Sequence, residues 1–428
     1  MSLPLRARRV LVTFTAVGAT AVSALLAPAM ADAAPAPQPA TATAAAAAMT
    51  SATITGHGYG HGRGMGQYGA YGYAVNYHWT YQRILSRYYG GTHLARPAAA
   101  KGSNRINVRL TAFNGKNVRV TSKSSWFKVG NKYRFEAGQY AVLKYLSDGK
   151  IQVYRGSSCT SGATLVGTVT TGVVRSAAAP GNDVRKMLAV CNGATRKVYR
   201  GYLTLLSKDG TWGGRRLVNT VGVDDYLRGV VPRESPASWA DAGKGWGMQA
   251  IRAQTIAARG YALTDTVHSE NHSQTCDTTA CQVYGGAGTN DTRIEDSRTD
   301  NAVATTTGLV LLNSAGKMVA SEFSASTGGF TAGGTFPAVS DQGDAAASNN
   351  PYHNWTSKVS TASLQSRYGS VIGTLTSMKV TLRDGHGAGG GRAVWVRLYG
   401  TKGHTDPISG ESFRSQLGLK STWFFLPA

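Results

Sequence analysis

The chain contains 428 residues, with 45 Lys and Arg against 22 Asp and Glu and a formal net charge of +23 at pH 7. This length is sufficient for two or three domains, or for one large domain with insertions. The basic residues are scattered singly among Gly and Tyr and are not clustered as on a recognition helix, so we expect no nucleic-acid partner. We interpret the charge as long-range attraction to an anionic surface or polymer.

Residues 1–34 have the layout of a secretory signal peptide. The first part is basic (Arg6, Arg8 and Arg9), an uncharged apolar run follows (Val10 to Leu26), and residues 29–34 are mostly small. Residues 35–50 are mostly Ala, Pro, Thr and Gln and lack the large apolar side chains that offset the entropy of ordering, so we expect a flexible linker. The sequence therefore predicts a secreted protein with no stable membrane span after cleavage.

Residues 51–100 are expected to hold a short strand, a glycine-dense segment and a short helix. Glycine occupies nearly every second position from Gly56 to Gly72, which lets the backbone bend sharply and lets a polymeric ligand approach the main chain. Thr80 can cap a helix whose apolar residues up to Tyr88 share one face, and Gly90-Gly91 would end it.

Residues 101–198 are expected to form a β-rich unit. Apolar and polar residues alternate, as around Ile106, Val108 and Leu110, and turn dipeptides such as Asn114-Gly115 separate the runs.

Residues 199–428 are expected to form a core that mixes helices and strands. A strand pair, Tyr202 to Leu206 and Leu217 to Val221, flanks the turn Asp209-Gly210. From about Trp246 to Thr264, apolar and small residues step by three and four along one face, which predicts a long helix. Short strands and loops follow it. The expected fold class of the chain is α+β, with strands predominating.

The segment from Val230 to Pro236 is expected to be a loop that carries a carboxylate, Glu234, between two prolines. The fixed φ angles of the prolines would hold this side chain in place, and apolar neighbours such as Trp239 would raise its pKa, as a general acid requires near neutral pH. The alternative is an ordinary exposed glutamate at the approach to a helix. On residue chemistry alone, that alternative is the more common situation.

Two arginines and two histidines are further candidates. Arg252 and Arg259 lie seven residues apart on the expected helix and hence on one face, where one of them could orient Glu234 or hold a substrate carboxylate. An ordinary solvated stripe is the alternative. His57 and His61 have a spacing seen in metal sites, but a glycine-rich loop leaves the ligand geometry unspecified. A sugar-facing loop and a structural turn are therefore the two interpretations of that segment.

Four cysteines in a chain expected to be secreted imply disulfides, with three possible connectivities. Proximity in the sequence favours the pairs Cys159–Cys191 and Cys276–Cys281. His268 and His272, together with the second pair, would also make a zinc set. The oxidising compartment favours the disulfide, so we expect neither a metal nor a cofactor.

Several segments, taken in order along the chain, resemble motifs of the SpoIID/LytB family. Residues 226–236, which read YLRGVVPRESP, are similar to the family's YLxGVVpxEMP stretch, and Gln249 to Leu263 is similar to its ALKAQAVAARTYAL helix. The other matching segments are Tyr199-Arg200-Gly201, Cys276 to Thr279, Cys281 to Gly286, Phe323 to Gly329, Pro351 to Trp355, and Phe413-Arg414 with Leu417 to Leu419. Each match alone is unspecific, but five or six in the same order are specific.

The resemblance implies a peptidoglycan lytic transglycosylase that cleaves the MurNAc–GlcNAc bond, with Glu234 as its catalytic acid and base and Arg259 as a second catalytic residue. We expect a further set of residues to bind the glycan strand (Arg252, Ser324, Ser326, His57, His61, Gln67 and Tyr68). Related members stimulate wall amidases, so the alternative is a non-catalytic wall-binding protein that recruits or stimulates an amidase. A teichoic-acid-binding adhesin is a third interpretation. The expected location is extracellular or at the cell wall.

The sequence departs from the family pattern in three places. Ser235 stands where methionine is usual, residues 240–247 form a longer link, and Ala280 replaces a histidine that helps bind zinc in some members. In addition, residues 51–100 resemble the C-terminal segment of the family but precede the core. We therefore expect a circularly permuted core made of residues 51–100 and 199–428, with the β-rich unit inserted between them.

Overall fold

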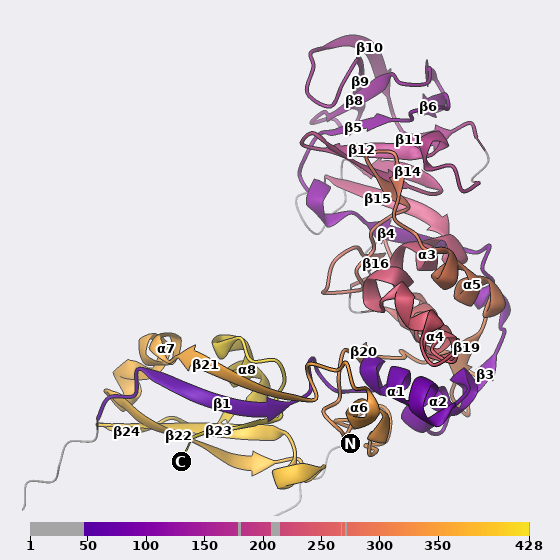
Figure 1. The fold of residues 1–428 in the computed structure, drawn as a ribbon. Coiled ribbons are helices and arrows are strands. Elements are labelled where there is room, and N and C mark those ends of the chain that lie inside the picture. Colours follow the sequence, from indigo (N-terminus) through magenta and orange to yellow (C-terminus); the bar gives the residue numbers. More distant parts are fainter. Residues whose placement is uncertain (1–46, 179–180, 207–214, 267, 270–271, 428) are drawn as a thin grey trace, which may run out of the picture. The chain divides into compact units, whose positions relative to one another are not determined.

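The computed structural model describes residues 47–178, 181–206, 215–266, 268–269 and 272–427 (Figure 1). The expected signal peptide, most of the expected linker and the turn Asp209-Gly210 lie outside the described residues. Both helices and many short strands are present, which confirms the α+β class. Among the described residues, no helix is long and apolar enough to cross a membrane.

Two sheets contain most of the strands of the middle region. The eight-stranded sheet has the order β10-β9-β8-β5-β12-β13-β17-β18, with β5 Val118–Thr121, β8 Tyr140–Tyr145, β9 Ile151–Gly156, β10 Ala163–Val169, β12 Leu188–Asn192, β13 Thr195–Tyr199, β17 Gly288–Thr289 and β18 Thr292–Arg293. The seven-stranded sheet has the order β16-β4-β15-β14-β11-β6-β7, with β4 Arg105–Arg109, β6 Phe127–Val129, β7 Tyr133–Phe135, β11 Gly172–Ser176, β14 Tyr202–Leu206, β15 Arg216–Gly222 and β16 Thr275–Cys276. Apolar side chains of both sheets join one core.

The seven-stranded sheet joins strands from both sides of residue 199. Strand β15 pairs with β14 on one side and with β4 on the other, so the expected strand pair is present and is continuous with the β-rich unit. Two short 3₁₀ helices, Thr111–Phe113 and Val184–Lys186, lie between strands of the middle region. The position of the Glu234 segment is therefore fixed by a sheet that begins near residue 105.

The expected loop from Val230 to Pro236 is wrong for most of its length, because helix α3 (Val223–Glu234) extends as far as Glu234. Its buried residues recur at helical spacing and join the core of the two sheets: Val223, Tyr226, Leu227, Val230 and Val231. Asp224 and Asp225 in the first turn favour the helix electrostatically. Pro232 lies inside the helix and cannot donate to the carbonyl of Arg228, four residues earlier; the helix ends two residues after it.

Helix α4 (Met248–Thr264) confirms the expected long helix, and it packs on both sides. One face contacts α3 and α5 (Ser297–Thr305), and the other contacts α1 (Gln67–Tyr77) and α2 (Tyr81–Tyr88). Helix α2 lies where the sequence predicts it. Helix α1 was not predicted, because its glycines resemble a loop; Gly72 lies so close to the Gly343 carbonyl of α6 (Gln342–Ala346) that a Cβ atom would be 1.9 Å from that oxygen.

The N-terminal strand lies among C-terminal strands. Strand β1 (Ser51–His57) pairs over its whole length with β21 (Asn354–Ser360) and also pairs with β26 (Phe424–Phe425). In Figure 1 the indigo β1 accordingly lies beside orange and yellow strands. The remaining elements are β22 Leu375–Arg383, β23 Ala393–Gly400, β24 Gly403–His404, β25 Ile408–Ser409, α7 Ala362–Ile372, α8 Gly410–Leu417, β2 Met65–Gly66 with β20 Phe323–Ser324, β3 His93–Ala95 with β19 Val310–Leu312, and the 3₁₀ helices Ala98–Ala100, Ala237–Asp241 and Ala388–Gly390.

Candidate functional site

Glu234, the last residue of α3, lines a cavity of about 380 Å³. Tyr261 of α4 and the segment from Thr279 to Val283 form one wall of this cavity. The other wall comes from the glycine-dense segment after β1 and from residues 322–324. Three regions that are far apart in the sequence therefore meet at one carboxylate.

The carboxyl group of Glu234 is held in a desolvated environment. Burial raises the pKa of Glu234 above its ordinary value, and the Val283 N–H, which donates to Oε1 at 3.0 Å, opposes that rise. Gln67 also lowers this pKa slightly, although its amide nitrogen makes no hydrogen bond within ordinary distance. The net effect is a larger protonated fraction near neutral pH, which is what a general acid needs.

The Val283 N–H is positioned by its neighbours along the chain. The Cys276–Cys281 disulfide closes the preceding loop, and the Gln282 amide nitrogen donates to the Ala258 carbonyl of α4 at 3.2 Å. On the other side, the Tyr284 hydroxyl donates to Asn219 at 2.8 Å. The donor to Glu234 is thus anchored to α4 and β15, which reduces its freedom to move away from the carboxylate.

An ion pair and a neutral imidazole lie on the opposite wall. Arg63 holds Glu322 with its guanidinium fork, the shortest N–O distance being 2.7 Å. Burial, followed by the charge of Arg63, lowers the pKa of His61 to about 4. Since Nδ1 of His61 accepts the Arg63 backbone N–H at 3.0 Å, a neutral ring carries its proton on Nε2. The Arg63–Glu322 ion pair and neutral His61 therefore lie in the same cavity as Glu234.

Two buried polar groups of this region have no hydrogen-bond partner within the described residues. Ser324 is 7% exposed and lines the cavity, and its hydroxyl is unpaired. The Nε2 atom of Gln67, beside Glu234, is unpaired as well. Buried polar groups in folded proteins are normally hydrogen-bonded, so the Ser324 hydroxyl is available to bind a ligand, whereas Gln67 lies close enough to Glu234 to act on its carboxylate.

Arg259 does not lie with Glu234. It is fully buried and donates to the carbonyls of Thr306 and Leu309 and to Asp224 Oδ1, at 2.8, 3.0 and 3.0 Å. Asp224 is in the first turn of α3 and Glu234 is its last residue, a separation of about 15 Å along the helix axis. The position of Arg259 thus corrects the expectation that it acts beside Glu234: its contacts hold α4 to the start of α3.

The other expected binding residues are divided between the cavity and its surroundings. His61 and Ser324 line the cavity, and Gln67 lies near Glu234 without lining it. Arg252 donates to the Thr305 hydroxyl of α5, and His57 contacts Asn354 and the ring of Trp423. Ser326 is buried and donates to Asp344. Tyr68 packs between Trp239 and Tyr352, with ring centroids 5.0 and 5.8 Å away.

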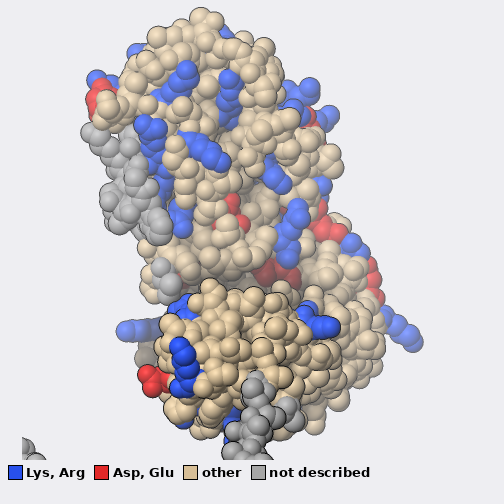
Figure 2. All heavy atoms as spheres, turned by 90° about the vertical axis from the view of Figure 1, so that its left-hand side faces the viewer, with Lys and Arg blue, Asp and Glu red and all other residues tan. Residues whose placement is uncertain are grey.

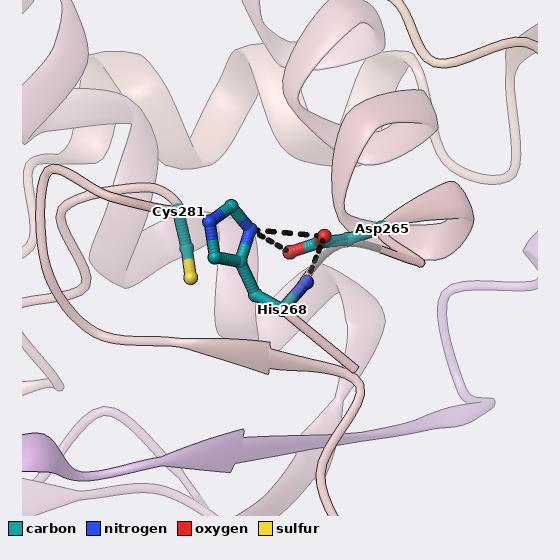
Figure 3. Close-up of side chains that lie close together, drawn as sticks. All are labelled: Asp265, His268 and Cys281. Atoms are coloured by element: carbon teal, nitrogen blue, oxygen red, sulfur yellow. Dashed lines mark hydrogen bonds and ion pairs between the residues drawn. The ribbon is translucent and has the colours of Figure 1, made fainter. Parts of the chain in front are cut away.

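The four cysteines form the two disulfides that proximity favours. The Cα–Cα distances are 5.6 Å for Cys159–Cys191 and 5.5 Å for Cys276–Cys281. His268 binds Asp265 at 3.0 Å beside Cys281 (Figure 3), while His272 is exposed. Because Cys281 is already bonded to Cys276, the zinc set considered from the sequence has lost its two thiolates.

Sequence reasoning assigned no role to Tyr261, Arg63 or Glu322. Tyr261 lies two residues after Arg259 in the helix match, so its helical position was available as a signal. Arg63 belongs to the glycine-dense segment, but nothing in its sequence surroundings points to Glu322, 259 residues away. The parallel pairing of β2 with β20 and the bridge between Tyr59 and Ser326 bring these two segments together.

Comparisons with known proteins match the part of the chain that contains Glu234. The family model described as SpoIID, stage II sporulation protein, matches residues 212–312. The "Amidase enhancer" of Bacillus subtilis (strain 168) is 41% identical over 105 residues, which is 24% of this chain and 12% of that protein. An uncharacterized protein of Brachyspira hyodysenteriae (strain ATCC 49526 / WA1) is 32% identical over 119 residues, 27% of this chain and 28% of that protein. No solved structure matches.

The matched region supplies the part of the cavity lining that contains Glu234. Residues 212–312 include all of α3 and α4 and the segment that ends in Val283, and so supply Glu234, its hydrogen-bond donor and Tyr261. The shared region is only a small part of both relatives, so their whole activities are not transferred with it. Residues 212–312 of this chain are therefore similar to the SpoIID family.

Proposed function

We propose that this protein acts on the bacterial cell wall as a peptidoglycan lytic transglycosylase, with Glu234 as its acid and base. The observation that carries the proposal is the raised pKa of Glu234 in a cavity that is also lined by the buried, unpaired hydroxyl of Ser324. A site of this kind can both bind a polar polymer and give it a proton.

In the proposed reaction, Glu234 donates its proton to the glycosidic oxygen while the bond from that oxygen to the sugar's C1 breaks. The 6-hydroxyl oxygen of the same sugar then bonds to C1, and its proton passes to the Glu234 carboxylate. The products are a chain end with a free hydroxyl and a 1,6-anhydro sugar, and no water is consumed. This reaction requires no second catalytic carboxylate. Glu322, the other carboxylate of the cavity, therefore needs no catalytic role, which is consistent with its hydrogen bonds to the guanidinium group of Arg63.

The test is Glu234→Gln in the full chain, incubated with purified peptidoglycan and followed by mass spectrometry of soluble products. General acid–base catalysis contributes typically 10²–10⁴-fold, so anhydro products should fall by about that factor while thermal stability is retained. Glu136→Gln is the matched control, because Glu136 is an exposed carboxylate paired with Arg134 in the β-rich unit. An undiminished yield of anhydro products from Glu234→Gln would remove Glu234 from the mechanism.

A second function is supported by the similarity to the "Amidase enhancer". In this alternative the same cavity binds the glycan without turnover, and the protein recruits or stimulates a wall amidase. Wild-type protein would then release no anhydro products, and both it and Glu234→Gln would raise the rate of a purified wall amidase equally. Measuring both products in one digest separates the two functions.

Both functions place the protein outside the cell or in its wall. The two disulfides suit an oxidising compartment. The signal peptide expected at residues 1–34 would deliver it there, and the expected partners are glycan strands and anionic wall polymers. Determining the N-terminal residue of the secreted protein tests this placement.

A further inference from the structure

A second hollow lies next to the Glu234 cavity and has a different character. It measures about 390 Å³, and its lining includes two aromatic rings, two cations and one carboxylate: Tyr59, Tyr352, Arg414, Lys420 and Glu411. These five residues lie outside residues 212–312, which the SpoIID family model matches.

The two aromatic rings are held open to solvent. Tyr59 is 41% exposed, and its ring centroid is 4.7 Å from that of Tyr352. The glycines on either side of Tyr59 have φ angles of 76° and 101°, a region that favours glycine, and they pack against the segment 324–327. The backbone of Tyr59 also exchanges hydrogen bonds with Ser326 in both directions. An exposed aromatic side chain on such a fixed backbone is suited to stacking on a ligand, because little freedom is lost on binding.

The cations give the hollow a preference for negative charge. The ammonium group of Lys420 lies 5.9 Å from the ring centroids of both tyrosines, so it is positioned above the aromatic pair. Arg414 is paired with Glu411 and also donates to the Leu419 carbonyl. Lys420 is therefore the cation that a ligand carboxylate can engage.

The second hollow and the Glu234 cavity are joined by one short stretch of chain. Tyr59 lines the second hollow while Gly60 and His61, the next two residues, line the cavity. Two residues of extended chain span at most about 7 Å. Close to this stretch, Gln67 lies near Glu234, and the ring of the next residue, Tyr68, is 5.8 Å from that of Tyr352. One polymer could therefore occupy both hollows.

We propose that Tyr59, Tyr352 and Lys420 form a second carbohydrate-binding site, which takes the sugars of an acidic amino-sugar strand next to those bound at Glu234. The aromatic pair stacks on a sugar face, and Lys420 binds a carboxylate carried by that sugar as a lactyl or peptide substituent. The site thus selects strands that still carry carboxylates over neutral ones. The proposal rests on the proposed function in one respect, that the same strand also reaches Glu234. Binding at the second site does not require that the strand is cleaved.

The test measures binding by calorimetry in the full chain carrying Glu234→Gln, so that no ligand is consumed. The two probes are a neutral N-acetylglucosamine tetrasaccharide and a peptidoglycan tetrasaccharide of the same length that carries its carboxylates. Adding Tyr59→Ala should weaken the binding of both probes by about tenfold, and Tyr59→Phe should restore it, because the ring is what stacks. Lys420→Gln should weaken only the acidic probe, by roughly three- to fivefold, and this difference should shrink in high salt.

Matched controls come from the same chain. Tyr77 is an equally exposed tyrosine (45%) at the end of α1, and Lys402 is an exposed lysine in a β turn; Tyr77→Ala and Lys402→Gln should leave both affinities unchanged. Thermal melting checks that every variant is folded. If Tyr59→Ala leaves the affinity for both probes unchanged, the proposal is overturned. If the Glu234→Gln chain that retains Lys420 binds the two probes with equal affinity, the proposed preference for charged strands is overturned.

The outcome also separates this site from the proposed function. If wild-type protein releases no anhydro products but Tyr59→Ala still loses affinity, the second site stands and the transglycosylase function fails. If products form normally and Tyr59→Ala leaves both binding and cleavage unchanged, the transglycosylase function stands and the second site fails.

Discussion

The β-rich region and the SpoIID-matched region of this protein carry opposite electrostatic character. Residues 101–206 contain 18 Lys and Arg against 3 Asp and Glu, whereas residues 212–312 contain 9 against 11. In the upper part of Figure 2, which is the β-rich part of Figure 1, Lys and Arg are spread over the face and Asp and Glu are few. Most of the net charge of the chain thus belongs to a region that supplies none of the residues around Glu234.

The difference shows that attraction and chemistry are served by different parts of the molecule. Exposed cations act at long range and are screened by salt, so they can raise the local concentration of an anionic polymer without fixing its position. In the SpoIID-matched region, by contrast, several charges are buried or half-buried and paired, as at Arg259 and Asp224 or Arg293 and Glu295. Such groups respond to pH and to mutation more than to salt.

The largest expected effect comes from removing the residues before 100, which belong neither to the β-rich region nor to the SpoIID-matched region. A chain that begins at residue 100 lacks β1, α1 and α2, and so exposes the apolar face of α4 and the partner edges of β21 and β26. We expect it to be insoluble, or folded without wall-degrading activity. Soluble expression, circular dichroism and a digest of peptidoglycan measure this, and a truncated chain as stable and active as the full one would refute a core shared by residues 51–100 and 199–428.

The next effect tests how charge is used inside the SpoIID-matched region. Arg259→Ala removes one member of a buried ion pair and leaves two carbonyls and Asp224 without their donor, so unfolding should become easier by about 3–5 kcal/mol. Arg252→Ala, seven residues earlier on α4, removes only a bond to Thr305 and should cost less than about 1 kcal/mol. Denaturant titration of both variants measures the difference; equal stability with lost cleavage would return Arg259 to a catalytic role.

A pH dependence should arise from a buried carboxylate outside both regions. Burial, and then the charge of Asp344, raise the pKa of Asp341 to about 7. The folded state therefore binds this proton more tightly than the unfolded chain, so the stabilisation is complete below about pH 4 and is lost as the pH rises towards 7. The slope is at most about 1.4 kcal/mol per pH unit. Asp341→Asn, which keeps a residue that can cap α6, should flatten the curve of unfolding free energy against pH; an unaltered curve would contradict this assignment.

The smallest expected effect tests the cations of the β-rich region directly. Replacing two exposed lysines there, Lys116 and Lys123, by Gln should weaken binding to whole cell walls by roughly two- to threefold at low salt and not at all at high salt. The same replacements at Lys358 and Lys379, exposed lysines on β21 and β22, serve as the control with equal loss of charge. Co-sedimentation with cell walls measures both, and equal losses would show that only the net charge of the whole chain matters.

Local sequence determined much of this protein. The three- and four-residue spacing of apolar and small residues specified α4, alternation specified the strands of the middle region, and the spacing of the cysteines favoured the two disulfides that form. Matching segments in order pointed to the SpoIID family and to Glu234. Helix α3 could have been predicted too, since Val223, Tyr226, Leu227, Val230 and Val231 have helical spacing; the two prolines and the Val-Val pair obscured it.

The surroundings of Glu234 depended on the tertiary structure. Its pKa is set by how deeply the end of α3 is buried and by a backbone N–H 49 residues away, and no local pattern records either quantity. The wall that carries Arg63, His61 and Glu322 exists because β1 and β2 pair with strands from the far end of the chain. Likewise, helix spacing places Arg252 and Arg259 on α4, but only the packing of α4 on α3 decides that Arg259 meets Asp224 and not Glu234. Contacts between residues that are distant along the chain depend on the packing of whole elements, and for that reason they were settled by the fold and not by the sequence motifs.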